Sequence, residues 1–425
     1  MKLAVIGGGW AGLAAAVQAT AAGHQATVFE ASRDWGGRAR TLHADRTLDN
    51  GQHILLGAYA ATLALMQQVG VDPAACLLRT PLDLRLPNGH GLRLPRLPAP
   101  WDAALGIAAA RGWSVRDKWH LLRITDRWRR AGFSCAPETT VSRLCQDVSD
   151  PVYRTLMAPL CLAALNTSPE RASARVFLRV LHDALLGAPG SSHMLLPAVG
   201  LGALFPEPAL AWLQTRGATV QAGARVTALA RTAGCWNIGG AAFDHVILAC
   251  PPTEAARLVA EALPLLPVAA QPPAGNWLAR TRALRFEAIT TVYLQTAGTR
   301  LARPLLALDS DSERPAQFVF DRGQLGGPAG LLALVASASH GPADLLEQQA
   351  RHQARQQLGV TDVHSARTIT EKRATFACTA GLERPPVHIA PGLSACGDYV
   401  DGPYPATLEG AVRSAHSAVA QIGCA

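Results

Sequence analysis

A glycine-rich turn between a short apolar run and an alanine-rich segment constrains the fold more than any other feature of the sequence. Residues 3–6 are continuously apolar, which is typical of a buried parallel strand. Three glycines follow with the spacing G-x-G-x-x-G, at Gly7, Gly9 and Gly12. The first allows a tight turn, the second lets the backbone approach a pyrophosphate, and the third lets helix and strand pack closely.

The residues after these glycines complete the context that a dinucleotide-binding fingerprint requires. Residues 13–22 are strong helix formers, Gly23 ends this helix, and a second predicted strand at 26–29 stops at Glu30. The helix N-terminus offers unpaired N–H groups to a phosphate. Glu30 can accept hydrogen bonds from both hydroxyls of a ribose and would repel a 2′-phosphate. We therefore predict an α/β fold with a Rossmann-like dinucleotide-binding domain.

The cellular compartment is indicated by the N-terminus and by the cysteines. Lys2 followed by an apolar run to Ala22 resembles a secretory signal, but such a signal has no need of the glycine-rich turn at 7–12. No other uncharged apolar stretch has the length of a membrane-spanning helix. The nine cysteines include no C-x-x-C pair, which argues against a disulfide framework and a cysteine zinc site. We therefore expect a cytoplasmic protein without a metal centre.

Further motifs identify the dinucleotide. Glu30 and Ala31 are followed by Gly36, Gly37 and Arg38, an arrangement that resembles the second signature of the FAD-dependent amine oxidase and phytoene desaturase superfamily. Two glycines let the chain pass close to a cofactor, and the arginine offers charge-assisted donors near its pyrophosphate.

The resemblance continues along the chain in the order that this superfamily uses, and it implies FAD as the cofactor. The strand at 246–250, followed by two prolines, resembles the superfamily's crossing point between domains. The resemblance implies that residues 49–53 pass by the flavin ring and that the backbone of Val226, within a strand, meets the adenine. It also implies that Asp398 binds the ribityl or phosphate region, and that the N-terminus of a last helix, which includes Leu408, faces the flavin pyrimidine.

Because these motifs lie at both ends and in the middle of the chain, the cofactor domain must be discontinuous. We assign residues 1–80, 196–255 and 386–425 to a GR2-type, Rossmann-like FAD-binding domain, and residues 81–195 and 256–385 to a mixed α+β substrate domain. In the substrate domain we predict strands of one sheet at 289–294, 317–320 and 331–335, and helices at 114–130, 172–186 and 342–358.

Other segments narrow the resemblance to one family. Residues 160–167 with 172–181, and residues 192–197 with 49–59, resemble the hydroxysqualene dehydroxylase family, also called squalene-associated FAD-dependent desaturases. With the flavin motifs, the resemblance covers nearly the whole chain. It implies reduction of hydroxysqualene to squalene on the bacterial route to hopanoids, with hydride from N5 of reduced flavin reaching an allylic carbon.

An amine substrate is less consistent with the sequence. Amine oxidases of this superfamily usually carry a lysine on the substrate-domain strand that faces the flavin, and residues 285–294 contain none. Thr407 also stands where many of them place an aromatic residue.

Removal of an allylic hydroxyl calls for an apolar pocket with one proton donor beside the flavin. His53 is a candidate donor because it lies in the stretch expected beside the flavin ring, although an imidazole there can also bond a flavin oxygen or a backbone carbonyl. Tyr404, which precedes the last predicted helix, is the second candidate. A tyrosine between two prolines is, however, also a common packing residue of loops.

Two other functions stay open. One is a phytoene-type isoprenoid desaturase, which would use the same flavin motifs in the oxidative direction. The other is a flavin-free lipid carrier like the Rab GDP dissociation inhibitors, which resemble this superfamily; the intact Glu30, Gly36–Arg38 and Asp398 argue against it.

Residues 111–130 concentrate positive charge and tryptophan. They hold seven basic residues against Asp117 and Asp126, a local charge of +5 within a net charge of +8, together with three tryptophans. Because the implied isoprenoid substrate is a membrane lipid, we expect peripheral contact of this segment with the inner face of the cytoplasmic membrane. A solvated helix with buried tryptophans explains the composition equally well. No nucleic-acid-binding module surrounds these residues, so we expect no nucleic acid partner.

Overall fold

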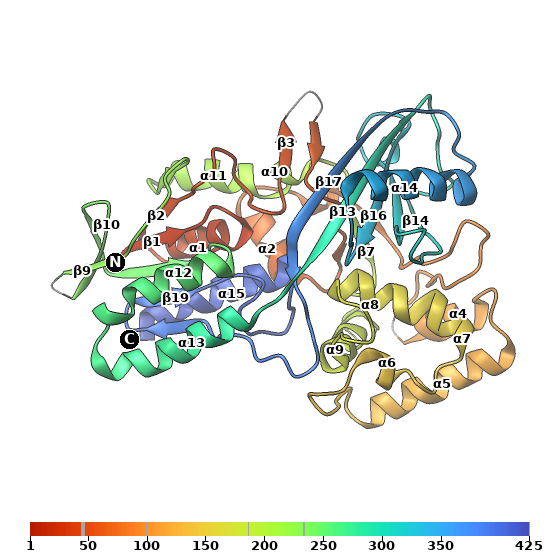
Figure 1. The fold of residues 1–425 in the computed structure, drawn as a ribbon, viewed down its shortest axis with the longest axis horizontal. Helices are drawn as coiled ribbons and strands as arrows, with labels where there is room; N and C mark the ends of the chain where they lie inside the picture. Colours follow the sequence, from red (N-terminus) through yellow and green to blue (C-terminus); the bar gives the residue numbers. More distant parts are fainter. Residues whose placement is uncertain (44–46, 99, 186, 233, 425) are drawn as a thin grey trace.

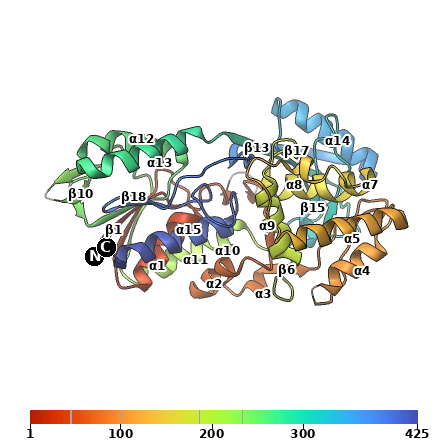
Figure 2. The same cartoon turned by 90° about the horizontal axis from the view of Figure 1, so that it is seen from below.

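The computed structural model describes residues 1–43, 47–98, 100–185, 187–232 and 234–424 (Figure 1). A six-stranded sheet with its helices lies beside the two termini, a five-stranded antiparallel sheet lies beyond it, and a group of helices from α4 to α9 lies below the second sheet (Figures 1 and 2).

The six-stranded sheet is assembled from distant parts of the chain. Its order is β18-β19-β12-β1-β2-β8, and every pairing except β18 with β19 is parallel. The strands are β1 (Lys2–Ile6), β2 (Gln25–Phe29), β8 (Thr219–Gln221), β12 (His245–Leu248), β18 (His388–Ala390) and β19 (Leu393–Ala395). The predicted parallel sheet therefore forms, and the apolar run at 3–6 lies in its centre.

Helices cover both faces of this sheet (Figure 2). One layer contains α1 (Trp10–Ala21), which packs on both α11 (Pro206–Gln214) and α15 (Leu408–Ala420). The other layer contains α12 (Pro252–Ala262) and α13 (Gln271–Ala283). The expected domain boundary at 255/256 falls inside α12. Because α13 packs on β18, the cofactor side of the molecule extends to α13.

The second sheet is antiparallel, with the order β14-β15-β16-β13-β17. Its strands are β13 (Phe286–Thr296), β14 (Leu305–Ala307), β15 (Phe318–Asp321), β16 (Leu331–Ser337) and β17 (Val363–Phe376). The three strands predicted here share this sheet, as expected. Its own core includes Val292, Leu294 and Leu332, against which α14 (Ala343–Leu358) places Ala350 and Ala354.

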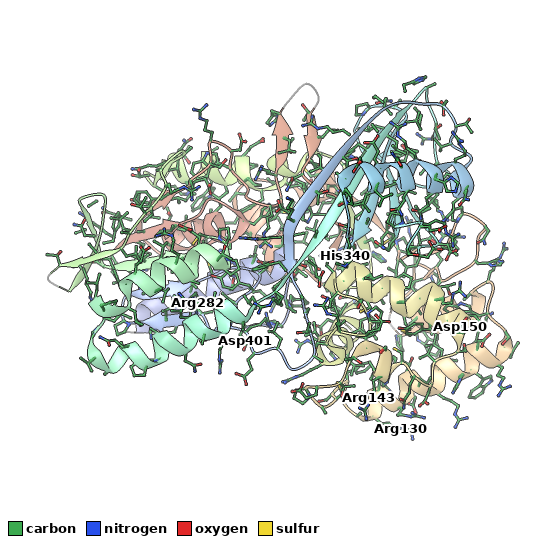
Figure 3. All side chains as sticks on the ribbon, in the orientation of Figure 1. Arg130, Arg143, Asp150, Arg282, His340 and Asp401 are labelled. Atoms are coloured by element: carbon green, nitrogen blue, oxygen red, sulfur yellow. The ribbon has the colours of Figure 1, made fainter. Side chains whose placement is uncertain are left out.

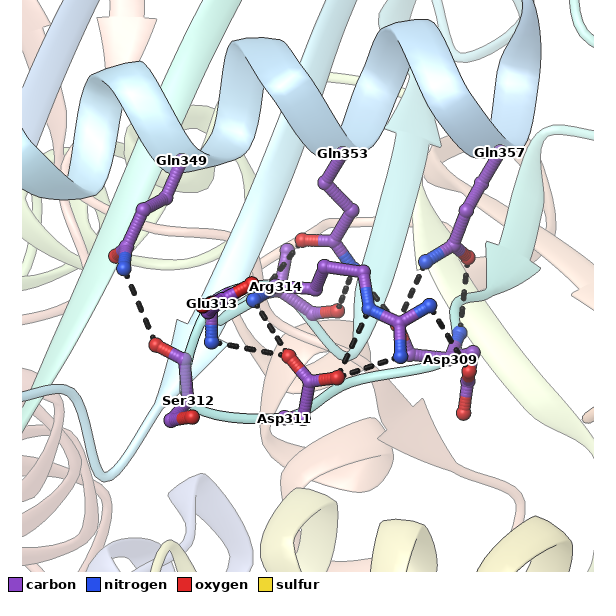
Figure 4. A network of polar contacts seen from close by, with 9 residues as sticks. Asp309, Asp311, Ser312, Glu313, Arg314, Gln349, Gln353 and Gln357 are labelled. Atoms are coloured by element: carbon purple, nitrogen blue, oxygen red, sulfur yellow. Dashed lines mark hydrogen bonds and ion pairs between the residues drawn. The ribbon is translucent and has the colours of Figure 1, made fainter.

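Glutamines of α14 hold the loop between β14 and β15 (Figure 4). Gln353 accepts from the backbone N–H of Ala316 at 3.0 Å and donates to the carbonyl oxygens of Asp309 and Ala316, and Gln357 bonds both backbone groups of Asp309. Gln353 is completely buried, so its amide satisfies loop groups that water cannot reach.

The helical part begins with α4 (Trp101–Ala109) and α5 (Val115–Arg130) and includes α6 (Val141–Leu144), α7 (Asp150–Val152), the π-helical turn η1 (Tyr153–Met157), α8 (Ala158–Leu165) and α9 (Ala174–Leu185). Ser114 and Asp117 form a capping box that starts α5 at the predicted position. None of the helices that the structure describes combines the length and hydrophobicity needed to span a bilayer.

The remaining elements connect these parts. A small sheet pairs β5 (Leu55–Leu56) and β6 (Leu77–Thr80) with β7 (Met194–Pro197). The other strands and α-helices are β3 (Thr41–His43), β4 (Thr47–Asp49), α2 (Ala60–Gln68), α3 (Pro73–Cys76), α10 (Leu201–Leu204), β9 (Ala230–Thr232), β10 (Cys235–Ile238) and β11 (Ala241–Phe243). Four short 3-10 helices complete the described chain: η2 (Leu263–Leu265), η3 (Val268–Ala270), η4 (Arg322–Gln324) and η5 (Gln421–Cys424).

Candidate functional site

The glycine-rich turn between β1 and α1 has the tight geometry that its sequence predicts. Gly7 has a φ of +116°, and a Cβ added there would lie 2.6 Å from the carbonyl oxygen of Ala249. A Cβ on Gly12 would lie 1.8 Å from the carbonyl oxygen of Gly7. At Gly9, the N-cap of α1, an added Cβ would meet its nearest neighbour, the Cα of Gly37, only at 3.7 Å. Gly7 and Gly12 are therefore fixed by packing, whereas Gly9 leaves room for a ligand close to the backbone.

Glu30 directly follows β2 and lies beside this turn. Its Oε2 accepts from the backbone N–H of Gly8 at 2.6 Å, and its Oε1 accepts from that of Ser32 at 2.7 Å. A carboxylate has about four lone-pair sites, so each oxygen retains acceptor capacity for a ribose hydroxyl. The two backbone bonds orient the carboxylate at the edge of the sheet where the N-terminus of α1 also lies.

The segment that carries Val226 begins beside Glu30, but it is not a strand. The backbone N–H groups of residues 223 and 224 donate to the carbonyl oxygens of Ser32 and Glu30, each at 2.8 Å. The chain then leaves this pairing, and residues 224–229 form no strand, contrary to the expectation. Val226 is buried, and its carbonyl accepts from Arg257 at 3.4 Å, so a guanidinium rather than a neighbouring strand holds its backbone.

Arg38 and Asp398 come from distant parts of the chain and form an ion pair. Arg38 also donates to the carbonyl oxygen of Ala374 at 2.6 Å. Burial acts to lower the pKa of Arg38, but the carboxylate of Asp398 outweighs it and the pKa is raised. Gly36, next to Gly37, donates its N–H to the carbonyl of Gly8 at 2.9 Å, which holds the second glycine turn against the first. The residues predicted for the pyrophosphate and the ribityl region therefore lie together.

Leu408 begins α15, as predicted. The hydroxyl of Thr407 caps this helix by accepting from the backbone N–H of Gly410 at 3.0 Å. A Cβ on Gly410 would lie 1.9 Å from the carbonyl oxygen of Tyr404, so the loop before the helix packs directly on its first turn.

Glu409 locks this helix end to another helix. Its carboxylate is completely buried. It accepts from the backbone N–H groups of Ala61 at 3.1 Å and Thr62 at 2.8 Å, both in the first turn of α2. It also accepts from the hydroxyl of Thr62 at 2.8 Å and from Arg413 at 2.7 Å. The N-termini of α2 and α15 are thus held by one carboxylate, which complements the positive end of each helix dipole.

Residues 49–53 lie against β13, the strand of the second sheet that was expected to face the flavin. The hydroxyl of Tyr293 donates to the carbonyl oxygen of Asp49 at 2.7 Å. The hydroxyl of Thr291 lies 3.9 Å from where a Cβ on Gly51 would be, and it is buried without a hydrogen-bond partner in the described parts of the chain. A buried, unpartnered hydroxyl at this point fits a cofactor that brings its own polar atoms.

The surroundings of His53 keep its imidazole neutral. Burial, followed by the positive charge of Arg38, lowers the pKa of His53 to about 4. A neutral ring at pH 7 does not support the proton-donating imidazolium that the sequence suggested. Hydrogen bonding by His53 to the flavin or to a backbone carbonyl stays a prediction.

An apolar cavity of about 350 Å³ starts beside these residues. Ile54 and Thr407 line it on the cofactor side. Leu121, Leu122 and Arg129 of α5 also line it; Leu121 is buried, whereas Leu122 and Arg129 are exposed at the surface. Its volume lies in the range of small-molecule sites, and most of its wall is leucine, alanine, isoleucine and methionine.

A polar corner interrupts this apolar wall. The hydroxyl of Tyr404 bonds the carboxylate of Asp183, and burial together with this carboxylate raises the pKa of Tyr404 to about 12. Asp183 also accepts from Arg179 at 2.7 Å. The rings of Tyr59 and Tyr404 meet edge to face, with centroids 6.0 Å apart. The sequence indicated Tyr404 but not Asp183, because an aspartate four residues after an arginine on a helix is typical of an ordinary surface ion pair.

Comparisons with known proteins agree with this geometry. Residues 10–423 match the sequence profile of the family described as flavin containing amine oxidoreductase. Hydroxysqualene dehydroxylase of Rhodopseudomonas palustris is 29% identical over an alignment 447 positions long, which covers 97% of this chain and 96% of the relative. Hydroxysqualene dehydroxylase of Sinorhizobium fredii is 30% identical over 268 residues, covering 60% of this chain and 63% of the relative.

Solved structures show the same fold. Putrescine oxidase superposes with a TM-score of 0.70 at 15% identity, covering the whole of both chains. Reduced UDP-galactopyranose mutase superposes with a TM-score of 0.69 at 14% identity, covering 100% of this chain and 96% of that chain.

The family match settles the cofactor. FAD is the cofactor of this protein, so a flavin-free carrier is not favoured. We propose that Gly9, Glu30, Arg38 and Asp398 would hold it. The protein is an oxidoreductase with a mixed α/β fold built around a parallel sheet. The chain belongs to the family of flavin containing amine oxidoreductases.

Proposed function

We propose that this oxidoreductase reduces hydroxysqualene to squalene. The observation that carries the proposal is the apolar cavity, which joins the cofactor side at Ile54 and Thr407 to a polar corner at Tyr404 and Asp183. A C30 hydrocarbon needs such walls, and its hydroxyl needs one polar partner. Two relatives named hydroxysqualene dehydroxylase, one of them aligned with 97% of this chain, support the same substrate.

The residues of the cavity suit the chemistry of an allylic alcohol. The change from C–OH to C–H consumes a hydride and a proton and releases water, and reduced FAD supplies the hydride when it is bound. A phenol with its pKa raised to about 12 keeps its proton at neutral pH. Tyr404 has a single O–H, which Asp183 accepts in this structure, so Tyr404 would serve the departing oxygen by moving that hydrogen bond from Asp183 to the substrate hydroxyl. Asp183 orients that phenol, and the apolar wall keeps water from the developing carbocation.

Anaerobic turnover tests the proposal. FAD-loaded protein that has been fully reduced with dithionite is incubated with hydroxysqualene, and the lipids are extracted and analysed for squalene. Squalene is expected, and its absence with fully reduced, flavin-loaded protein would refute the proposal. Conversion of phytoene to a conjugated polyene by the oxidised protein would instead support a desaturase.

The role of Tyr404 is tested in the same assay. We expect Tyr404→Phe to lower kcat by about 10²-fold, the low end of the usual contribution of an acid or base, while the amount of bound flavin stays the same. Squalene formation at the rate of the unmodified protein would show that another group serves the hydroxyl.

A further inference from the structure

Two adjacent helices expose large apolar side chains where the cavity reaches the surface. Trp101 and Leu105 of α4 are four residues apart, and Val115, Trp119 and Leu122 of α5 follow the same helical spacing, so each set lies on one face of its helix. Trp101 and Trp119 are each 65% exposed, and Val115 is 76% exposed. We call these five side chains, together with the basic residues described below, the α4–α5 surface.

The α4–α5 surface is continuous with the cavity. Lys118 of α5 donates to the carbonyl oxygen of Ala108 of α4 at 2.7 Å, which holds the two helices side by side. Leu122 is 41% exposed and also lines the cavity, and Ala104 of α4 lines it between the two exposed residues of its helix. An apolar path therefore leads from the exterior of these helices to the interior.

Basic side chains border the apolar face of α5. Arg116, Arg123, Arg127 and Arg130 are exposed and recur at helical spacings of seven, four and three, so they form a row beside Val115, Trp119 and Leu122. Figure 3 shows Arg130 projecting from the outer side of α5.

Acidic residues pair with two of the four arginines in this row and leave the other two without an ion pair in the described parts of the chain. Asp117 is held in the capping box of the helix by Ser114. Asp126 is paired with Arg129 at 2.8 Å and with Arg130 at 2.6 Å. Asp147, outside the helix, pairs with Arg127 at 2.8 Å, which leaves Arg116 and Arg123 as the cations best placed to meet an anionic partner.

We infer that the α4–α5 surface docks on an anionic lipid bilayer and takes up the substrate directly from it. Exposed tryptophan and leucine beside a row of arginines is the composition of helices that lie in a membrane interface, where the rings enter the headgroup region and the guanidinium groups contact phosphate. The inference also refines the sequence-based expectation for 111–130. Trp113 and Trp128 are buried in the protein, while α4 contributes Trp101 to the docking face. It rests on the proposed function only in taking the substrate to be a membrane lipid.

Vesicle flotation with the FAD-loaded protein tests this inference. The probes are vesicles of phosphatidylcholine alone and vesicles of phosphatidylcholine with 30 to 40% phosphatidylglycerol, a composition chosen to resemble an anionic bacterial membrane. Binding to the anionic vesicles is expected, with loss of binding as salt is raised. Trp101→Ala with Trp119→Ala, and separately Arg116→Glu with Arg123→Glu, should each weaken binding by about tenfold or more.

Matched variants control for net charge and for general hydrophobicity. Arg282→Glu with Arg355→Glu changes the net charge by the same amount away from the α4–α5 surface, and Figure 3 places Arg282 in another part of the molecule from Arg130. Val268→Ser removes an exposed apolar side chain elsewhere. Both controls should bind vesicles like the unmodified protein.

The outcomes separate this inference from the proposed function. No binding to anionic vesicles, or binding that the α4–α5 variants do not weaken, would overturn the inference, as would capture of a protein partner by this surface without vesicle binding. Turnover of detergent-dispersed hydroxysqualene should stay the same in the variants, because none of the four residues lines the cavity. Failure of that turnover in the unmodified protein would refute the proposed function alone.

Discussion

Replacing Glu409 by alanine should destabilise the protein far more than replacing an ordinary glutamate. The carboxylate is completely buried and is the acceptor for the N–H and the hydroxyl of Thr62, which is itself completely buried. Removing it leaves two donors that water cannot reach, each at a cost of about 1 to 3 kcal/mol. The ion pair with the half-exposed Arg413 adds little to the stability that is lost. Part of the loss is offset because the variant no longer has to bury the negative charge of Glu409. We expect the free energy of unfolding to fall by about 3 to 5 kcal/mol.

Urea unfolding followed by far-UV circular dichroism measures this change, on both the FAD-loaded protein and the protein stripped of FAD. Glu261→Ala is the matched control, because Glu261 also pairs with an arginine four residues away, Arg257, but is 46% exposed. It should change the free energy of unfolding by no more than about 0.5 kcal/mol. Glu409→Gln retains one carbonyl acceptor and should fall between the two.

Two chemically identical changes, Glu409→Ala and Glu261→Ala, should therefore differ widely in their effect on the free energy of unfolding. If the free energy of unfolding of Glu409→Ala stayed within about 1 kcal/mol of that of the unmodified protein while flavin was retained, the bonds to Thr62 would not hold α2 against α15. A loss confined to the FAD-loaded form would mean that Glu409 acts through the cofactor and not through the helix ends.

Three further predictions concern other parts of the chain. Glu30→Lys should reduce the ratio of flavin to protein after dialysis more than Glu30→Gln does. The lysine places a cation where the ribose is expected and removes the acceptor for the glycine turn. An FAD affinity equal to that of the unmodified protein would show that the adenosine lies elsewhere. Burial, followed by the charge of His388, lowers the pKa of His245 to about 4. As the pH falls, this residue therefore binds a proton near pH 6.5 in the unfolded chain but only near pH 4 in the folded chain. Protonation linked to His245 should therefore account for a fall of about 1 to 2 kcal/mol in the free energy of unfolding from pH 7 to pH 5, beside a parallel contribution from His53. His245→Gln should reduce the total fall by that amount, whereas His340→Gln, on the exposed surface, should leave it unchanged. Asn166 is buried, has a left-handed backbone with a φ of 45°, and bonds two neighbouring segments. Both Asn166→Ala and Asn166→Gly lose the side-chain bonds, but only glycine relieves the backbone strain, so the alanine variant should have the lower melting temperature. A lower melting temperature for the glycine variant would show that backbone strain at this position is not the deciding cost.

Features set by local sequence could be predicted in advance. The glycine turn at Gly7 and Gly12, the strand ending at Glu30 and the start of α5 at Ser114 each depend on residues close together in the chain, and the structure contains all three. The start of α15 at Leu408 was found in the same way, with the help of the family resemblance.

Features that depend on tertiary packing could not be predicted. Asp183 became part of the cavity only because α9 lies beside the loop that carries Tyr404. The segment around Val226 is not the expected strand, and its carbonyl is bonded by Arg257 from another part of the chain. The helix α13 lies on the cofactor side because it packs on β18. Periodicity contains no information on which helix will lie beside which loop.

The assembly of the parallel sheet from distant segments has a consequence for how the protein is made. Arg38 is 360 positions from its partner Asp398, and the carbonyl of Ala11 is 385 positions from the thiol of Cys396 that contacts it. During synthesis, α1 therefore leaves the ribosome long before α15 exists to cover it, and its alanine-rich surface stays without its native neighbours for most of translation. Pairing over such separations is slow and leaves apolar segments open to aggregation. We expect folding to finish only after residues 393–420 emerge, so the nucleotide-binding turn, although made first, is among the last parts of the protein to be completed.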